Sequence, residues 1–573
     1  MSNDFDTRKK SLNEAQKLAV ETIDGPLLVI AGPGTGKTEL LSMRAANILR
    51  KTDASPENIL CLTFTDSGSA AMRARLTSII GPEAYKVSIH TFHSFCTEII
   101  NQNHEYFYNG ASLDVADDIS KNLIIEEILD ELDYRDALAS KFNGKYSAKK
   151  DILNSIRDLK NAGLTAAELL QIIDANEKFI DEVEPKLTEI FLQGINKKTI
   201  QLLIPIAEEI KSLSVDNTPL PPSIDPLSNS FLVSLRRALD EFIETGKTNS
   251  VTAWRNDWLE GKKENYAFKD RKRNKKLRTL AFIYEQYMLR MNEAELFDFD
   301  DMILNVIQAM DKYPELVSNL QERYQYIMVD EFQDTNPAQM RILFKLTETA
   351  TGDDPNVMAV GDDDQAIYSF QGADINNIMH FRQYYPNFKH IILTENYRSG
   401  DKILESSREV SANISNRLET SMDICKKLTA RTQKYADADV KIVDLPNTQT
   451  EYHWIANSIT EQISKGTNPN EIAVLARKHD SLKSLVPYLL HNNISVNYDF
   501  RDNVLTLNSI QAIELIARII SEISNENHDL ANSMIPELLC HPMFNIPAET
   551  IWRLSLKANR ERLSWLEIMQ END

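Results

Sequence analysis

Cysteine is scarce in this sequence, with only four in 573 residues: Cys61, Cys96, Cys425 and Cys540. Their wide scatter excludes the paired spacings of a zinc site or a disulfide framework, so we expect reduced, mostly buried thiols. A run of about 18 apolar residues that could cross a bilayer is also absent. The amino terminus MSNDFDTRKKSLNEAQ contains no apolar stretch of the kind found in secretory signals. Together these absences predict a soluble, cytoplasmic protein.

Positive charge is in short supply as well, because 63 Lys and Arg face 85 Asp and Glu and leave a net charge of −22. This balance argues at first against a nucleic-acid partner, since phosphate contacts normally come from clustered basic residues. One basic stretch stands out, with Tyr266 and Phe268 interleaved: Lys262, Lys263, Lys269, Arg271, Lys272, Arg273, Lys275, Lys276 and Arg278. Two interpretations remain open, a solvated helix or loop face and a contact to a nucleic-acid backbone.

The apolar pattern predicts an α/β protein of roughly three or four domains. Residues 27–31 and 59–64 read as buried parallel strands, each followed by a segment compatible with a helix. Long helical periodicity then extends from about 100 to 290, broken by a proline-rich loop at 219–222. Strands resume at 326–329, 357–360 and 390–393. We therefore expect one parallel sheet that is interrupted by a helical subdomain and completed afterwards.

A second α/β pattern is expected after the first sheet. Strands are predicted at 440–443 and 472–475, on either side of a helix that carries Trp454 and Ile455. The last fifty residues have a helical pattern.

A glycine-rich loop follows the first predicted strand and enters a helical segment that begins near Lys37. The loop consists of Gly32, Pro33, Gly34, Thr35, Gly36, Lys37 and Thr38. Glycines let successive backbone N–H groups point at one phosphate chain, Lys37 can reach the β and γ phosphates, and Thr38 can offer its hydroxyl to Mg²⁺. Ala31 stands where the usual pattern begins with Gly. A plain glycine turn is the alternative, but the order strand, loop, helix favours nucleotide binding.

Two carboxylates follow the predicted strand 326–329. Asp330 is expected to hold Mg²⁺ through its water shell, and Glu331 to orient and deprotonate the attacking water. An Asp-Glu pair on a surface turn is common and means little alone. Placed after an apolar strand in a chain that has a phosphate loop, the pair indicates the second half of the site.

These motifs stand in the order found in the superfamily 1 helicases of the UvrD/Rep/PcrA type, which the chain resembles over nearly its whole length. The segments that carry the resemblance are 12–16, 62–65, 89–94, 297–302, 329–336, 360–373 and 393–399. The most specific is Val329-Asp330-Glu331-Phe332-Gln333-Asp334-Thr335-Asn336. The resemblance implies P-loop NTPase motor domains of the RecA-like parallel-sheet type with inserted helical subdomains. It also implies ATP and Mg²⁺ as cofactors, and single-stranded DNA and duplex junctions as partners.

The resemblance further implies roles for single residues around the nucleotide. Gln16 would hydrogen-bond the adenine edge and Tyr397 would stack on adenine. Gln365 would sense the γ-phosphate, and Arg398 would act as an arginine finger on the transferring phosphoryl group. Glu39 stands where many relatives carry an Arg that touches the nucleotide, so a different adenine affinity is expected.

DNA contacts are implied for Phe64, Thr91, His93, Tyr368 and Phe370. Stacking of a base on an aromatic ring contributes about 1–3 kcal/mol and tolerates any base, which suits a motor that steps along arbitrary DNA. Ordinary core packing is the alternative for Tyr368 and Phe370. Phe370 stands where Trp is common, which preserves stacking, whereas Gln371 replaces a common Arg and puts a charged contact in question.

The resemblance divides the chain into four parts: a first motor domain at 1–100 and 290–392, a helical insertion at 101–289, a partial second motor domain at 393–522, and the start of a second insertion at 523–573. We find no match to the family's remaining motifs, so the chain is expected to be truncated. The long helical insertion is a candidate surface for a protein partner.

Three functions are compared on this basis. The favoured one is an ATP-dependent DNA helicase that moves 3′ to 5′ on single strands. For this chain alone we expect nucleotide binding, little hydrolysis and no strand separation. The alternative is a non-catalytic nucleotide- and DNA-binding module that retains a partial helicase fold, against which the intact Lys37, Thr38, Asp330 and Glu331 argue. A GTPase or small-molecule kinase is less favoured because no Asn-Lys-x-Asp segment is found.

Overall fold

The computed structural model contains two compact units, Met1–Val440 and Lys441–Asp573, which are described separately. It describes residues 2–107, 114–142, 144–213, 224, 226–261, 266–348, 352, 354–368, 376–414, 417–433, 435, 438–498 and 504–571. Among these residues, none of the helices combines the length and hydropathy that a bilayer crossing requires.

A six-stranded parallel sheet forms the centre of the first unit. Its strands, in spatial order, are β12 (Lys389–Leu393), β1 (Leu27–Ala31), β11 (Val357–Gly361), β10 (Tyr326–Val329), β2 (Ile59–Thr63) and β3 (Ser88–Thr91). β1 lies between β11 and β12, with Leu28 opposite Ala359 and His390. β2 pairs with β10, with Leu62 opposite Val329. Strands far apart in the sequence thus share one sheet, which confirms the prediction of an interrupted and later completed α/β fold.

Both faces of the sheet are buried, because successive side chains of a strand point to opposite sides. Leu28 and Ile30 enter one hydrophobic core, whereas Leu27 and Val29 enter the other. The first core is closed by α5 (Phe92–Gln102), α14 (Phe299–Lys312), α15 (Pro314–Arg323), α16 (Pro337–Thr347) and α17 (Asn376–Tyr384). The second is closed by α1 (Ser2–Ser11), α2 (Glu14–Glu21), α3 (Lys37–Lys51) and α4 (Asp66–Ile80). The loops at the carboxyl ends of the strands are therefore held from two sides.

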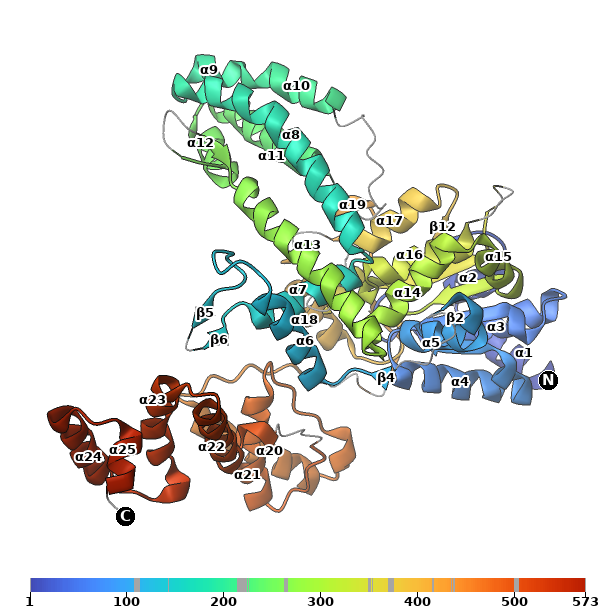
Figure 1. Ribbon diagram of the computed structural model, residues 1–573. Helices are drawn as coiled ribbons and strands as arrows, with labels where there is room; N and C mark the ends of the chain where they lie inside the picture. The colour runs from blue at the N-terminus through green and yellow to red at the C-terminus, as the bar shows by residue number, and fades with distance from the viewer. Residues whose placement is uncertain are drawn as a thin grey trace. The chain divides into compact units, whose positions relative to one another are not determined.

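The inserted segment is mostly helical, as predicted. Its helices are α6 (Asp118–Asp130), α7 (Lys149–Asn161), α8 (Ala166–Leu192), α9 (Lys197–Gln201), α10 (Leu203–Leu213), α11 (Leu227–Thr245), α12 (Asn249–Trp258) and α13 (Asp270–Glu293). Short strand pairs are β4 (Asp114–Val115) with β9 (Leu296–Phe297), β5 (Lys141–Phe142) with β6 (Lys145–Tyr146), and β7 (Leu259–Glu260) with β8 (Ala267–Phe268). Figure 1 shows the long helices α8 and α13 side by side. The insertion has hydrophobic cores of its own, one of which includes Phe231 and Trp254.

The basic stretch lies largely on α13, where part of it has acidic partners on α8. Arg271 forms ion pairs with Asp181 at 2.8 Å and Glu184 at 2.9 Å. Arg278 pairs with Asp174 and Glu177, both at 2.5 Å. Arg278 follows Arg271 on α13, but its partners Asp174 and Glu177 precede those of Arg271 on α8. The two helices therefore run antiparallel along this contact. Lys262 and Lys263 lie outside the described residues.

The chain then crosses the carboxyl edge of the sheet. This segment holds β13 (Glu395–Asn396), α18 (Asp401–Ser411), α19 (Leu418–Ser421) and β14 (Thr429–Ala430), and β13 and β14 pair in parallel. It belongs to the first structural unit, which extends to Val440.

The second unit consists of helices in its described part: α20 (Thr448–Ser464), α21 (His479–His491), α22 (Asn508–Ser524), α23 (His528–Leu539), α24 (Ala548–Glu561) and α25 (Trp565–Glu571). The helical prediction for the last fifty residues is confirmed, but the strands predicted at 440–443 and 472–475 are wrong. Neither segment forms a strand, and Ile442 and Leu475 are 92% and 93% exposed. A buried strand needs a neighbouring strand on which to pair, and the described residues of this unit provide none.

Candidate functional site

The glycine-rich loop joins β1 to α3, as predicted. Gly34 and Gly36 have φ of +69° and +86°, a region that L side chains rarely adopt, so glycine is required at both positions. The Thr35 hydroxyl donates to the Gly32 carbonyl at 2.8 Å and closes the loop. Lys37 is the first residue of α3. The free N–H groups of a helix N-terminus therefore face the same space as the loop, which favours an anion there.

Lys37 and Glu331 meet across the mouth of this loop. The Lys37 Nζ lies 2.5 Å from the Glu331 Oε2, although the two residues are 294 positions apart in the sequence. The meeting follows from the sheet, since β1 and β10 both flank β11 and end at the same edge. The two residues assigned to phosphate binding and to water activation are thus brought together as predicted.

Asp330 is the deeper of the two carboxylates after β10. Its backbone N–H donates to the Leu62 carbonyl at 2.8 Å, which extends the pairing of β10 with β2 by one residue. Burial and the adjacent Glu331 charge raise the pKa of Asp330 to about 6, while the Lys37 ammonium opposes that shift. A partly buried carboxylate with a raised pKa is stabilised in its charged form by a cation.

The residues fit a Mg²⁺ ion bound chiefly by water and phosphate oxygens. Asp330 supplies one hard oxygen donor, and Thr38, in the first turn of α3, supplies a partly exposed hydroxyl. No cluster of three or more His, Cys, Asp and Glu side chains placed to share a metal occurs among the described residues. A Mg²⁺ site of this kind does not need one, because it uses one or two protein ligands.

Glu331 itself has unusual backbone geometry. Its φ of 47° and ψ of 48° place a non-glycine residue in the left-handed region. Such conformations cost of order 1–3 kcal/mol and persist where the surroundings enforce them. The left-handed residue separates β10 from the turn at Phe332–Asp334 and directs its carboxylate to Lys37.

Gln333 links the ends of two strands, a role that the sequence reasoning missed. Its Nε2 donates to the Glu331 Oε2 at 2.9 Å, and its Oε1 accepts from the Asp362 N–H at 2.9 Å. A Cβ at Gly361 would lie 2.7 Å from that Oε1, so a larger residue there would displace the Gln333 amide from this position. Gln333 was part of a motif, but nothing in a single sequence indicates which neighbour its amide contacts.

The segment after β12 packs directly onto the phosphate loop. Asn396 Nδ2 donates to the Pro33 carbonyl at 2.5 Å, and the Tyr397 N–H donates to the Gly34 carbonyl at 2.9 Å. A Cβ at Gly34 would lie 2.7 Å from the Arg398 Cβ, which shows how near Arg398 stands to the loop. Asn396 is a second residue that the sequence reasoning left without a role.

Gln16 and Tyr397, both assigned to adenine, lie on the same side of the loop. Gln16 is 4% exposed, and its Nε2 donates to the Thr35 carbonyl at 2.9 Å while its Oε1 accepts from the Asn13 N–H at 3.0 Å. The Tyr397 hydroxyl accepts from Asn13 Nδ2 at 3.1 Å. Gln16 thus braces the phosphate loop in this structure, and its contact with adenine stays a prediction.

Glu39 also has protein partners. The Glu39 carboxylate lies 3.3 Å from both Arg8 and Arg75. The acidic residue at a position where relatives carry Arg therefore has two arginines beside it.

Of the residues assigned to DNA, Phe64 and Tyr368 lie against each other with ring centroids 4.7 Å apart and planes tilted by 43°. The Thr91 hydroxyl accepts from the Ser94 N–H at 3.2 Å and caps α5. His93 Nε2 lies 3.8 Å from an Asp300 carboxylate oxygen. Phe370 lies outside the described residues. The structure thus brings two of the assigned aromatic residues, Phe64 and Tyr368, into contact with each other. Contact with DNA stays a prediction for all five residues.

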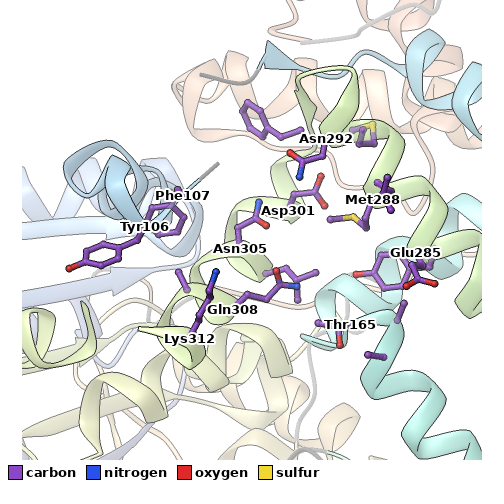
Figure 2. A pocket seen from close by; sticks show the side chains of 18 of the residues that line it. Tyr106, Phe107, Thr165, Glu285, Met288, Asn292, Asp301, Asn305, Gln308 and Lys312 are labelled. Atoms are coloured by element: carbon purple, nitrogen blue, oxygen red, sulfur yellow. The ribbon is translucent and has the colours of Figure 1, made fainter. Parts of the chain in front are cut away.

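Two cavities lie near these elements. One, of about 260 Å³, adjoins the loop and is lined by Gly32, Pro33, Gln365, Arg408 and Lys426 among others. The other, of about 570 Å³, lies between the insertion and α14, and Figure 2 shows polar side chains such as Asn292, Asn305 and Lys312 around it. The second cavity includes none of the residues assigned to nucleotide or DNA.

Comparison with known proteins identifies the family. The UvrD/REP helicase N-terminal domain matches residues 12–386, and the UvrD-like helicase C-terminal domain matches residues 391–571. The chain belongs to the UvrD/REP helicase family.

Curated relatives are similar along almost the entire chain. The ATP-dependent DNA helicase PcrA of Bacillus subtilis (strain 168) is 26% identical over 563 residues, which cover 98% of this chain and 59% of the relative. PcrA of Staphylococcus epidermidis (strain ATCC 12228 / FDA PCI 1200) is 24% identical over 98% of this chain and 60% of its own length. The chain thus spans about 60% of the length of the curated relatives that it matches.

The match at 391–571 bears on the second half of the chain. We expected a partial second motor domain followed by a truncated insertion and little activity, but the C-terminal domain match does not support an inactive fragment. The structural boundary at Val440 falls inside this match. The first part of this match, up to Val440, therefore belongs to the same unit as the phosphate loop.

Proposed function

We propose that this chain binds ATP with Mg²⁺ at the Gly32–Thr38 loop and uses its hydrolysis to move 3′ to 5′ along single-stranded DNA. The observation that carries the proposal is the meeting of Lys37 with Glu331 at the loop, with Arg398 close to Gly34 of the same loop. The family membership supports the same reading. A module for binding alone has no use for a base and a metal carboxylate side by side.

Each residue has a task in this proposal. Lys37 and the loop N–H groups bind the β and γ phosphates, and Asp330 and Thr38 hold the metal, which neutralises phosphate charge when bound. Glu331 accepts a proton from the attacking water. Arg398 brings positive charge to the phosphoryl group, and Gln365 faces the γ-phosphate. Gln16 and Tyr397 bind the base.

The Lys37–Glu331 ion pair suggests how nucleotide arrival prepares the base. Phosphate oxygens are a competing partner for the Lys37 ammonium, since both are anions near one cation. When Lys37 turns to phosphate, Glu331 loses its ion pair and retains the hydrogen bond from Gln333. The carboxylate is then free to accept a proton from water while its direction is preserved.

Hydrolysis of ATP with and without an oligothymidylate strand tests the proposal on the purified chain. We expect stimulation by the single strand and loss of nearly all hydrolysis in Lys37→Ala. Lys86→Ala, which removes an exposed lysine paired with Glu83, is the matched control and should behave as wild type. Nucleotide binding without any hydrolysis would instead support the non-catalytic module, and a preference for GTP in competition would contradict the assignment of ATP as the nucleotide.

A further inference from the structure

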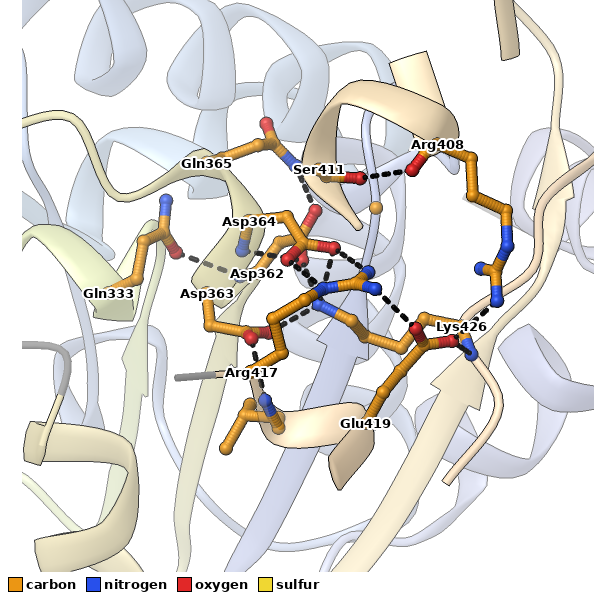
Figure 3. A network of polar contacts seen from close by, with 12 residues as sticks. Gln333, Asp362, Asp363, Asp364, Gln365, Arg408, Ser411, Arg417, Glu419 and Lys426 are labelled. Carbon is orange, nitrogen blue, oxygen red and sulfur yellow. Dashed lines mark hydrogen bonds and ion pairs between the residues drawn. The ribbon is translucent and has the colours of Figure 1, made fainter. Parts of the chain in front are cut away.

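Three consecutive aspartates at the end of β11 surround one buried lysine. The Lys426 Nζ lies 3.0 Å from Asp362 Oδ1, 2.5 Å from Asp363 Oδ1 and 2.9 Å from Asp364 Oδ2. The Lys426 side chain is 7% exposed. An ammonium carries three donor hydrogens, so each can serve one carboxylate. The arrangement, drawn in Figure 3, crosses more than sixty residues of sequence.

Arg417 completes the cluster from the same later segment. Its Nε and Nη2 donate to the two oxygens of Asp364 at 2.8 and 2.6 Å, a bidentate geometry. Its Nη1 lies 2.7 Å from Glu419, which also accepts the Lys426 N–H at 2.7 Å. The Leu418 N–H donates to Asp363 at 2.8 Å. We call Asp362, Asp363, Asp364, Arg417 and Lys426 the aspartate clasp.

The clasp contacts the side chain assigned to the γ-phosphate. Gln365 Nε2 donates to Asp362 Oδ2 at 2.7 Å, while Lys426 occupies the other oxygen of Asp362. A carboxylate only accepts hydrogen bonds, so the amide nitrogen of Gln365 must face it. Among the described residues that nitrogen has no second acceptor, so its other hydrogen can be donated to an anion. Both the position and the flip state of the Gln365 amide therefore depend on Asp362.

The clasp also needs its cations. Three neighbouring carboxylates repel one another, and burial penalises each charge. Burial raises the pKa of Asp363 even with Lys426 beside it. Burial has the same effect on Asp364, but hydrogen bonds from Arg417 and Lys426 outweigh it and leave the pKa of Asp364 below its ordinary value. Without Lys426, Asp362 would lose the charge balance that keeps it in place as the acceptor for Gln365.

We propose that Lys426 and Arg417 are positioning residues that act through the three aspartates to orient Gln365 toward the nucleotide. This inference rests on the proposed function. It assigns the orientation of the γ-phosphate-sensing side chain to residues from two parts of the chain. Asp362 and Gln365 lie in the N-terminal domain match, whereas Arg417 and Lys426 lie in the C-terminal one. If residues 417–428 moved away from the three aspartates, Gln365 would lose the support that orients its amide. Gln365 therefore faces the nucleotide only while that segment packs against the aspartates. Through Gln333 the clasp also connects to Glu331.

Equilibrium binding of fluorescent ATPγS and ADP tests the clasp without requiring turnover. Gln365→Ala should lower the affinity for ATPγS and leave that for ADP within about twofold. Lys426→Met should reproduce this loss of discrimination, and Lys426→Arg should restore most of it. Lys402→Met, which removes an exposed lysine paired with Asp439 on the same segment, should match wild type. Equal weakening of both nucleotides by Lys426→Met, or no weakening, would overturn the proposal.

Steady-state hydrolysis supplies the second readout. Lys426→Met should lower kcat about 10- to 100-fold with a small change in KM, since misplaced catalytic groups cost rates of that order. In a Gln365→Ala background the same substitution should add less than about twofold, and a full additional loss would show that Lys426 does not act through Gln365. A wild-type chain that binds ATPγS without hydrolysing ATP would contradict the proposed function, while the binding ratios would still decide the clasp.

Folding is checked by thermal unfolding of each variant. If Lys426→Met does not fold, Asp362→Ala carries the test, because it removes the acceptor of Gln365 and leaves Lys426 with two carboxylates. Asp362→Ala should then show the same loss of ATPγS over ADP discrimination as Gln365→Ala, and unchanged discrimination would overturn the proposal.

Discussion

At the residue scale, the decisive contact is the ion pair between Lys37 and Glu331. Glu331→Gln keeps the shape of the side chain but removes both its charge and its basicity. We expect kcat for ATP hydrolysis to fall about 10²- to 10⁴-fold, the usual contribution of a general base. ATP affinity should be preserved or increased, because Lys37 no longer has to leave a carboxylate. Single-turnover hydrolysis and ATPγS binding measure the two effects.

The exposed Glu57→Gln is the matched control for that substitution and should leave both quantities unchanged. Loss of nucleotide affinity in Glu331→Gln, with kcat near the wild-type value, would assign Glu331 to the metal rather than to the attacking water.

A second residue-scale prediction concerns His90, on β3. Burial lowers its pKa, Glu98 at 2.9 Å raises it, and the nearby Arg73 and Arg323 lower it again, so that the pKa lies below its ordinary value. At pH values between the lowered pKa of the folded state and the ordinary pKa of about 6.5, His90 binds more protons in the unfolded chain than in the folded one. The free energy of unfolding therefore rises with pH in this window and falls on acidification. The slope is at most about 1.4 kcal/mol per pH unit, and partial exposure of the ring reduces it to a fraction of that.

Urea unfolding of wild type and His90→Gln at pH 7.5, 6.5 and 5.5 measures this effect. The free energy of unfolding of the wild type should fall more steeply on acidification than that of the variant. His104→Gln, at an exposed position, is the matched control. If the free energy of unfolding of wild type and His90→Gln changed with pH in parallel, His90 would not contribute to the pH dependence of stability.

At the scale of elements, α13 divides the basic stretch into two sets of side chains. Arg271 and Arg278 pair with carboxylates of α8, whereas Lys275 and Lys276 are exposed and have no acidic partner within the part of the chain that the structure describes. If the exposed pair contacts single-stranded DNA, Lys275→Gln with Lys276→Gln should reduce the slope of log affinity against log salt by about 1.4, or about 0.7 per phosphate contact.

Fluorescence anisotropy of a labelled oligonucleotide between 50 and 200 mM salt measures that slope. The control, Arg271→Gln with Arg278→Gln, should keep the slope and cost about 1 kcal/mol of stability for each of these partly exposed ion pairs. An unchanged slope in the lysine variant would show that these lysines form a solvated face.

The elements also show where sequence reasoning succeeds. The strand residues Leu27–Ala31 and Tyr326–Val329 are apolar throughout, and buried parallel strands with these ends place Lys37 and Glu331 at one sheet edge. The segments 440–443 and 472–475 are also rich in apolar residues, but the described residues of the second unit contain no strand with which they could pair. A short apolar run forms a strand only where neighbouring strands exist to pair with it. The residues within the run do not show whether such neighbours exist.

At the scale of the whole molecule, the sequence identified individual motifs but not their connections. Lys426 and Arg417 are separated from Asp362 by more than fifty residues. The residues next to a single lysine or arginine in the sequence do not show whether its side chain is buried or which carboxylate it contacts. Gln333 and Asn396 lie inside recognised motifs, yet their amides were unassigned because hydrogen-bond partners depend on the assembled sheet edge. Long-range polar contacts are therefore what the structure adds.

These contacts predict reciprocal coupling between nucleotide and DNA. Gln365, the residue assigned to the γ-phosphate, lies three residues before Tyr368, whose ring contacts Phe64. The assigned sensor and one ring of the aromatic pair therefore share one short segment. If single-stranded DNA changes the affinity for ATPγS by some factor, ATPγS must change the affinity for DNA by the same factor, and coupling of this kind is typically about 5- to 150-fold. Titrations of each ligand with and without saturating amounts of the other measure both factors. ADP, which lacks the γ-phosphate, should give a smaller factor, and a factor of one for ATPγS in both directions would show that this segment does not connect the two sites.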